Sequence, residues 1–327
     1  MKTKNLLITG GSTRIGKEIA TFFSKKGWNI AIHYFKSSLK AKNLKKTIEK
    51  NRVKVALIKA DLKNSKQVEN IFTLAKKKLG TIDCLVNNAA LFENDDILDF
   101  KIKGWNEHLN VNLLAPAILT KNFAKQAPKK TISNIINIVD QRVFRLTPIF
   151  MSYTLSKSAL YTFTKTMAMR LGPNIKVNGI APGPTIKSKR QSIKHFNKQA
   201  KSTLLKKPVD TKDICDTVEF LINNNSITGE VLAVDGPQAY GLEARYVQGI
   251  WGPQQASNTN TYVHLVTDLW GGGSPHGNSE FIMGGFIVTG YRYSTAANLH
   301  DILQFHNLSE TIHSYLNLQL NCYYMET

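Results

Sequence analysis

The stretch TGGSTRIG, residues 9–16, is the most informative part of the sequence. It follows a short apolar run, residues 4–8, and opens a segment, residues 13–27, whose apolar side chains recur at helical spacing up to Gly27. This order predicts a strand, a tight turn and a helix. The backbone N–H groups of such a turn, with the helix N-terminus, can bind a pyrophosphate. Glycines also serve ordinary tight turns, so the stretch alone is weak evidence.

Further short apolar runs alternate with helix-like stretches along the chain. They lie at residues 28–34, 53–62, 82–90, 133–139, 175–183 and 230–236. Short apolar strands that alternate with helices predict an α/β fold with a parallel sheet covered on both faces. Ligands of such sheets bind in the crevice at the carboxyl ends of the strands.

The 327-residue chain is strongly basic, with 43 Lys and Arg, 23 Asp and Glu, and a net charge of +20. Such a charge suits nucleic acid, but the lysines are scattered along helix-like segments, for example 38–54 and 74–80, on faces expected to be solvated. We therefore expect no specific nucleic-acid partner. No apolar run reaches the length of a membrane span, so no membrane association and a cytoplasmic location are expected. Cys84, Cys215 and Cys322 lack the spacing of a metal or redox pair.

The composition changes abruptly after Gly236. Only Arg245 and Arg292 supply positive charge beyond it, and lysine is absent from that segment. Its five histidines, which contain no close pair at metal-ligand spacing, are better explained as scattered polar residues. We predict no metal site in the chain.

Two parts are therefore predicted. Residues 1–236 form a dinucleotide-binding domain that contains the whole site. Residues 237–327 form an atypical extension of unknown role, in which short apolar runs such as residues 281–293 suggest strands. The extension is an appended element, a poorly ordered segment or the product of an altered reading frame.

The end of the second predicted strand indicates which dinucleotide is bound. A site that prefers NAD usually places an acidic residue there, to accept hydrogen bonds from the ribose hydroxyls. This strand ends in HYFKSS, residues 33–38, without an acidic residue. Lys36 and Ser37, with Arg14 nearby, can instead bind a 2′-phosphate, which predicts NADPH. The alternative is that Lys36 is one of many solvated lysines.

Tyr153 and Lys157 lie four residues apart in a helical stretch and therefore share one face. A nearby ammonium group is expected to lower the pKa of the phenol towards neutrality, so that Tyr153 can deliver a proton as a hydride arrives from the nicotinamide. Such a pair also arises by chance between surface residues.

Taken together and in order, several motifs resemble the short-chain dehydrogenase/reductase family. They are the glycine turn, NNAA at 87–90, NVN at 110–112, the Tyr153–Lys157 pair and PGPT at 182–185. The resemblance spans nearly all of residues 4–236 and implies a Rossmann-type doubly wound parallel sheet. It implies cofactor contacts from Gly10, Arg14, Ile15, Gly16, His33, Lys36, Ser37, Asp61, Asn88, Ala89, Lys157, Pro182, Gly183 and Thr185. It also implies that Asn112 supports a proton relay to Lys157, and that the protein is a homo-oligomer, commonly a tetramer.

Two residues depart from the common family pattern. Arg14 replaces the middle glycine of the turn, and Asp140 stands where the family usually has serine, thirteen residues before Tyr153. An ionised carboxylate cannot donate a hydrogen bond to a carbonyl substrate. It can accept one from an amino or N–H group, or help Tyr153 to protonate a C=N bond.

The same departures make the sequence resemble pteridine reductases, at Arg14, His33–Ser38, Phe92, Asp140, Tyr153 and Lys157. The resemblance implies that Arg14 contacts both the cofactor phosphate and the pterin, and that Phe92 stacks on one pterin face. Phe92 is equally well explained as a hydrophobic loop residue that covers the end of the sheet.

The favoured hypothesis is reduction of a dihydropterin or dihydrofolate C=N bond by NADPH, with Asp140, Tyr153, Lys157 and Asn112 as the catalytic set. The runner-up is a carbonyl reductase that acts on a 3-oxoacyl thioester. A third hypothesis is an NADPH-binding protein without catalytic activity. The basic segment 184–200, the expected lid of the site, favours a substrate with an anionic tail.

Overall fold

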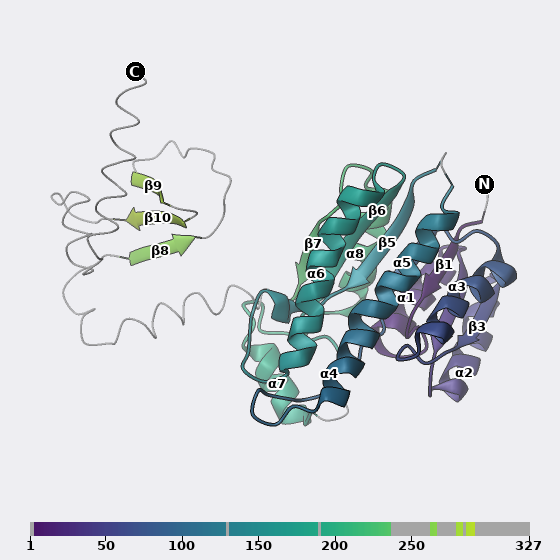
Figure 1. The fold of residues 1–327 in the computed structure, drawn as a ribbon, viewed down its shortest axis with the longest axis horizontal. Coiled ribbons are helices and arrows are strands. Elements are labelled where there is room, and N and C mark those ends of the chain that lie inside the picture. The colour runs from purple at the N-terminus through teal and green to yellow at the C-terminus, as the bar shows by residue number, and fades with distance from the viewer. Residues whose placement is uncertain are drawn as a thin grey trace, which may run out of the picture. The chain divides into compact units, whose positions relative to one another are not determined.

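The computed structural model describes residues 3–128, 131–188 and 191–236, and three strands further along the chain (Figure 1). The chain divides into two compact units, Met1–Arg245 and Tyr246–Thr327. No helix among the described residues is long and apolar enough to cross a membrane.

The first unit is built on a seven-stranded parallel sheet with strand order β3-β2-β1-β4-β5-β6-β7. The strands are β1 (Asn5–Ile8), β2 (Asn29–Tyr34), β3 (Val55–Lys59), β4 (Cys84–Asn87), β5 (Ser133–Ile138), β6 (Ile175–Pro182) and β7 (Val231–Val234). Each apolar run quoted from the sequence contains one of them. The order reverses between β1 and β4, and a doubly wound sheet binds its ligand at such a reversal. The predicted Rossmann-type fold is confirmed.

Helices flank this sheet on both sides, as Figure 1 shows. They are α1 (Arg14–Lys25), α2 (Ser38–Ile48), α3 (Ser65–Leu79), α4 (Ile102–Leu109), α5 (Ala115–Gln126), α6 (Met151–Leu171), α7 (Ile193–Lys201) and α8 (Thr211–Asn223). Short turns are the 3-10 helices η1 (Glu49–Asn51) and η3 (Gln141–Val143) and the π-helical turn η2 (Asn110–Leu114).

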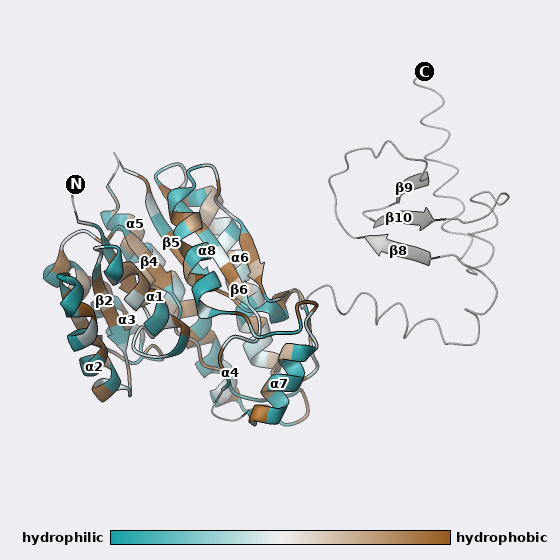
Figure 2. Cartoon of the chain, turned by 180° about the vertical axis from the view of Figure 1, so that it is seen from behind, coloured by the Kyte–Doolittle hydropathy of each residue, from teal (hydrophilic) through white to brown (hydrophobic). Residues whose placement is uncertain are grey.

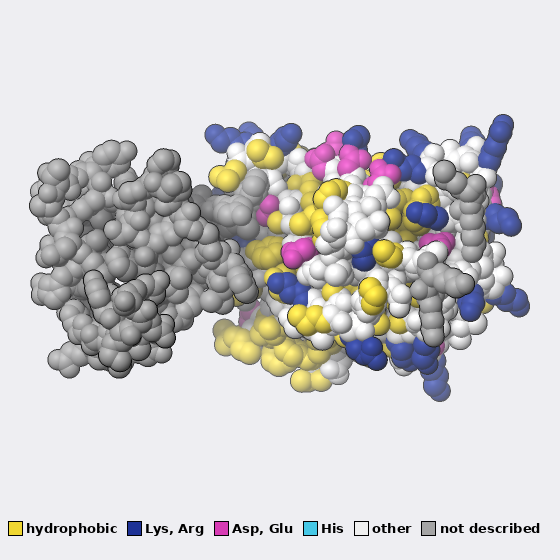
Figure 3. All heavy atoms as spheres, turned by 90° about the horizontal axis from the view of Figure 1, so that it is seen from above, with side chains coloured by type: hydrophobic (Ala, Val, Ile, Leu, Met, Phe, Trp, Pro, Cys, Tyr) yellow, Lys and Arg dark blue, Asp and Glu magenta, His cyan; other side chains and the backbone are white. Residues whose placement is uncertain are grey.

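Alternating side chains of the strands build one core on each face of the sheet. In β1, Leu6 and Ile8 pack with α1, α2 and α8, whereas Leu7 packs with α3, α5 and α6. The period of two along a strand explains this division. Figure 2 shows the polar residues on the outer sides of the helices, and in Figure 3 the basic side chains are spread over the face in view.

Within the second unit, β8 (Tyr262–Val266), β9 (Ser279–Met283) and β10 (Phe286–Tyr291) form an antiparallel sheet with order β8-β10-β9. Strands were predicted in the apolar runs of residues 281–293, and β9 and β10 confirm them. The predicted boundary lies between residues 236 and 237. Residues 237–245, which separate it from the end of the first unit, are outside the described part. The division of the chain at that point stays a prediction.

Candidate active site

The glycine turn closes over the carboxyl ends of β1 and β4. Gly10 has φ +62°, a conformation that side chains rarely adopt, and an added Cβ there would lie 3.1 Å from the Cα of Ala89. A Cβ on Gly16 would lie 2.5 Å from the Asn88 amide nitrogen and the Gly10 carbonyl oxygen. The backbone of the turn therefore packs at distances that only glycine permits.

The first turn of α1 presents backbone N–H groups without a side-chain cap. Thr13 at the N-cap makes no capping hydrogen bond, and no acidic residue lies in the first helical turn. Uncapped N–H groups at the positive end of a helix dipole suit a pyrophosphate. Ile15 lies here, partly buried against the core.

Asn88 and Ala89 are fixed to the end of β1 by hydrogen bonds. Their backbone N–H groups both donate to Thr9 Oγ1 at 3.0 Å, and the Asn88 side-chain amide donates to the Thr9 carbonyl oxygen at 2.8 Å. These bonds hold the NNAA segment beside the glycine turn, where the resemblance implies a cofactor contact.

His33 supports the turn from inside the protein. Its Nδ1 accepts from the Gly10 N–H at 3.2 Å, so Nε2 carries the proton and donates to the Ala60 carbonyl oxygen at 3.1 Å. Burial lowers the pKa of His33 to about 4, which keeps the ring neutral at physiological pH. Both ring nitrogens of His33 are therefore hydrogen-bonded to protein groups. A contact between His33 and the cofactor stays a prediction.

Lys36 and Ser37 lie after β2, beside the turn. The Ser37 hydroxyl is 2.6 Å from that of Ser12 in the glycine turn. The Lys36 side chain is exposed, with its ammonium over Phe35. Asp61, after β3, accepts from the Lys63 N–H at 3.0 Å through its carboxylate. These three residues therefore lie after the neighbouring strands β2 and β3, and their contacts with the adenine and the 2′-phosphate stay predictions.

Arg14, at the start of α1, has φ +54° and reaches across to the segment after β6. Its Nη1 and Nη2 donate to the carbonyl oxygens of Lys187 and Ile186 at 2.8 and 2.6 Å. Arg14, which was expected to contact the cofactor and the substrate, therefore joins the predicted lid, residues 184–200, to the glycine turn.

Pro182, Gly183 and Thr185 follow one another out of β6. A Cβ on Gly183 would lie 2.5 Å from the Cα of Asp235, so glycine is required for the packing against the end of β7. Thr185 Oγ1 donates to the Gly183 carbonyl oxygen at 3.0 Å. The segment is held at the carboxyl end of the sheet, where a nicotinamide contact is predicted.

Asp140, Tyr153 and Lys157 come together between β5 and α6. The Tyr153 hydroxyl donates to Asp140 Oδ2 at 2.5 Å, and the Lys157 ammonium donates to the Ile138 carbonyl oxygen at 2.6 Å. Asp140 Oδ1 accepts from the Arg142 N–H at 2.9 Å and so caps η3. Tyr153 and Lys157 are both buried.

The pKa of Tyr153 shifts opposite to the predicted direction. Burial raises it well above its usual range, and the adjacent Asp140 raises it further. The expectation of a phenol lowered towards neutrality by Lys157 is therefore wrong for the structure as it stands. Burial also lowers the pKa of Lys157 to about 8, against an opposing effect of Asp140. The Tyr153 phenol thus keeps its proton throughout the physiological pH range.

Asn112 is fully buried in the π-helical turn η2, a feature frequent at functional sites. Its side-chain amide donates to the Leu91 carbonyl oxygen at 3.0 Å and to Ser156 Oγ at 2.9 Å, and its Oδ1 accepts from the Leu91 N–H at 2.8 Å. These bonds join the loop after β4 to α6. No direct bond to Lys157 is among them, and the relay stays a prediction.

Phe92 lies beside Tyr153, with the ring centroids 4.6 Å apart. One of its faces is stacked on Phe150 at 4.5 Å and 13°. Phe150 therefore covers one face of the ring, and the residue as a whole is 37% exposed. The structure brings Phe92 to Tyr153, and this contact does not distinguish between the two explanations of Phe92.

Sequence analysis missed Phe150, the N-cap of α6. Its φ of +61° is strained for a bulky side chain. Its N–H donates to the Asp95 carbonyl oxygen at 2.8 Å, which helps to hold this conformation. Strain of this kind concentrates at functional sites. In the sequence, the position of Phe150 three residues before Tyr153 was the signal that could have identified it as a site residue.

A second missed group joins the loop after β4 to the start of α6. His108 Nε2 accepts from the Glu93 N–H at 3.1 Å, so Nδ1 donates to Ser152 Oγ at 2.7 Å. The Ser152 hydroxyl donates in turn to Asp95 Oδ2. Burial lowers the pKa of His108, which favours the neutral ring that this network needs.

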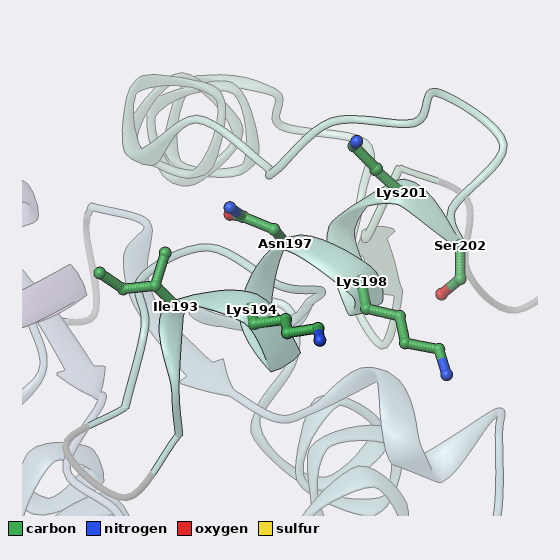
Figure 4. A pocket seen from close by; sticks show the side chains of 6 residues that line it. All are labelled: Ile193, Lys194, Asn197, Lys198, Lys201 and Ser202. Atoms are coloured by element: carbon green, nitrogen blue, oxygen red, sulfur yellow. The ribbon is translucent and has the colours of Figure 1, made fainter.

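A pocket lies on α7 and the turn that follows it (Figure 4). Its lining residues are Ile193, Lys194, Asn197, Lys198, Lys201 and Ser202. Ile193, Lys194, Asn197 and Lys198 belong to the basic segment 184–200 expected to cover the site, and Lys201 and Ser202 directly follow it. None of the predicted site residues lines the pocket.

Comparisons with known proteins show which family the chain belongs to. A family model described as enoyl-(acyl carrier protein) reductase matches residues 11–237. The chain belongs to the short-chain dehydrogenase/reductase family. It is therefore an oxidoreductase, and the hypothesis of a binding protein without activity is set aside.

Three relatives illustrate the range within the family. The uncharacterized oxidoreductase YgcW of Escherichia coli is 32% identical over 72% of this chain and 92% of its own. The 3-oxoacyl-[acyl-carrier-protein] reductase FabG of Staphylococcus epidermidis is 27% identical over 71% of this chain and 98% of its own. The crystal structure of FolM alternative dihydrofolate reductase 1 from Brucella suis, in complex with NADP, superposes with a TM-score of 0.70 at 37% identity, over 72% of this chain and 95% of its own.

The pKa of Lys157 leads to a prediction about cofactor binding. If its ammonium contacts the cofactor, NADPH affinity should fall roughly 10-fold as the pH rises through about 8, because the side chain loses its proton there. Ordinary lysines keep their charge up to about pH 10, and the 2′-phosphate is ionised above about pH 7. Titration of NADPH fluorescence between pH 7 and 9.5 measures this. Lys157→Met should bind weakly with little pH dependence; a wild-type affinity that is constant over this range would contradict the contact.

Proposed function

We propose that this enzyme uses NADPH to reduce the C=N bond of a dihydropterin or dihydrofolate. The observation that carries the proposal is the 2.5 Å hydrogen bond from the Tyr153 hydroxyl to Asp140 Oδ2. A carboxylate stands where a carbonyl reductase needs a hydrogen-bond donor. It suits a substrate ring that presents amino or N–H groups.

NADP(H) is the cofactor of this enzyme. The glycine turn and the uncapped N-terminus of α1 fit a pyrophosphate. β2 is followed by Phe35, Lys36 and Ser37, with no acidic side chain to favour the ribose hydroxyls of NAD. The FolM structures from Brucella suis and Brucella canis are complexes with NADP.

NADPH, when bound, would supply a hydride for the carbon of the C=N bond. Tyr153 donates its proton to the nitrogen, so that the product gains one C–H and one N–H bond. The high pKa of Tyr153 keeps this proton in place until the nitrogen becomes basic. Asp140 orients the hydroxyl and accepts from the substrate ring, and the Lys157 ammonium offsets the negative charge that Tyr153 develops.

Reduction of a 3-oxoacyl thioester is the second candidate, supported by the similarity to FabG. Asp140 argues against it, because an ionised carboxylate beside the carbonyl oxygen would repel the charge that develops there.

Parallel assays of NADPH oxidation with dihydrobiopterin, dihydrofolate and an acetoacetyl thioester test the proposal. We expect turnover of at least one pterin and little turnover of the thioester. Exclusive turnover of the thioester would overturn the proposed substrate while leaving the family assignment intact.

We also propose that the protein is a cytoplasmic homotetramer. Leu155 and Met169 on α6 are exposed apolar side chains that contact between copies would cover. Light scattering of the purified chain measures the mass; a monomer at micromolar concentration would contradict this assembly.

A further inference from the structure

Arg142 lies in η3, two residues after Asp140, and its guanidinium group rests on an aromatic wall. The group is 4.7 Å from the ring centroid of Phe150 and 5.7 Å from that of Phe92. Its Nη1 donates to Thr147 Oγ1 at 2.6 Å. Stacking and this bond fix the orientation of the side chain beside the catalytic tyrosine.

Most of the hydrogen-bonding capacity of this guanidinium is unused within the described residues. A guanidinium carries five N–H donors in one plane, and the hydrogen bond to Thr147 uses one of them. No salt bridge among residues 3–128, 131–188 and 191–236 includes Arg142. Arg142 as a whole is only partly buried, so part of the residue is open to solvent.

The surroundings of Arg142 suit an aryl group that carries a negative charge. A guanidinium edge binds a carboxylate through two parallel hydrogen bonds, with higher specificity than an ammonium group. Phe92, in the loop after β4, is 37% exposed, and Leu146 and Ile149, between η3 and α6, are exposed apolar side chains. An aromatic linker can pack on these groups while its carboxylate meets Arg142.

We propose that Arg142 binds a carboxylate of the substrate and thereby selects dihydrofolate over dihydropterins without a carboxylate. The inference rests on the proposed reduction of a pterin C=N bond and names its substrate class. Dihydrofolate carries an aminobenzoyl ring and a glutamate, which provide the aryl linker and the carboxylates. Dihydrobiopterin carries a short neutral side chain. Arg142 is therefore a specificity-determining residue and takes no part in proton transfer.

Steady-state kinetics of Arg142→Met with dihydrofolate and dihydrobiopterin at saturating NADPH test this role. The ratio of kcat/KM for dihydrofolate to that for dihydrobiopterin should fall roughly 10- to 100-fold, the cost of a charged hydrogen-bonded pair. The loss should appear in KM for dihydrofolate, with kcat nearly unchanged, and Arg142→Lys should restore part of it. Arg170→Met removes the same charge from an exposed position in the last turn of α6, and should leave the ratio unaltered.

A measurement on the wild-type enzyme covers the case in which Arg142→Met does not fold. Aminobenzoylglutamate should compete with dihydrofolate, whereas its uncharged diamide should not. Equal inhibition by both compounds, or an equal loss of both pterin activities in Arg142→Met, would overturn the carboxylate contact alone. If the wild-type enzyme reduces neither pterin, the proposed function fails as well, and the two failures are thereby distinguished.

Discussion

Replacement of Asp140 with serine should invert the substrate preference of the enzyme. Asp140 accepts from Tyr153 and presents a carboxylate to the substrate, whereas a serine hydroxyl can donate to a carbonyl oxygen. We expect pterin reduction to fall about 10²- to 10³-fold and thioester reduction to rise from its low wild-type level, as expected when one hydrogen-bonding group of a site is lost or gained. Assays of NADPH oxidation with both substrate types measure the inversion.

Asp140→Asn is the matched control for the charge. It keeps the shape of the side chain and an oxygen that can cap the Arg142 N–H, but removes the carboxylate. Asp140 raises the pKa of both Tyr153 and Lys157, so loss of the charge in either variant should lower both. The pH at which NADPH affinity falls should therefore move below about 8 in both. Unchanged pterin kinetics in Asp140→Ser would remove the main support for the C=N substrate.

Replacement of Tyr153 with phenylalanine should produce the second large effect, a loss of about 10²- to 10⁴-fold in kcat, the usual contribution of a positioned general acid. The variant removes one hydroxyl and keeps the ring that packs on Phe92. NADPH affinity should change little, because the hydroxyl is assigned to proton transfer. Single-turnover reduction measures the chemical step directly; a rate within threefold of wild type would assign the proton to another group.

The sequence allowed prediction of the first unit because its physical signals are local. Each strand of the sheet is a short apolar run such as residues 133–139, and the glycine turn is contiguous in the chain. The pair of Tyr153 and Lys157 follows from helical spacing alone. These predictions needed no knowledge of contacts between distant segments.

The electrostatics of the site could not be predicted in the same way. The pKa of Tyr153 depends on its burial and on the 2.5 Å approach of Asp140, which only the packing of α6 on β5 determines. Phe150 and Arg142 have no periodic or motif-like signal, and their role becomes visible only when Phe92, from the loop after β4, lies against them. The contacts of Arg14 with Ile186 and Lys187 likewise join residues that are more than 170 positions apart.

The central claim is that hydride from NADPH and a proton from Tyr153 are added across a pterin C=N bond. Reaction of the wild-type enzyme with NADPH deuterated at both C4 positions, followed by mass spectrometry of the product, tests it most directly. We expect a tetrahydropterin that carries one deuterium on the carbon of the former C=N bond, and Tyr153→Phe should nearly abolish its formation. A pterin that remains unlabelled while an acetoacetyl thioester acquires the deuterium would contradict the claim.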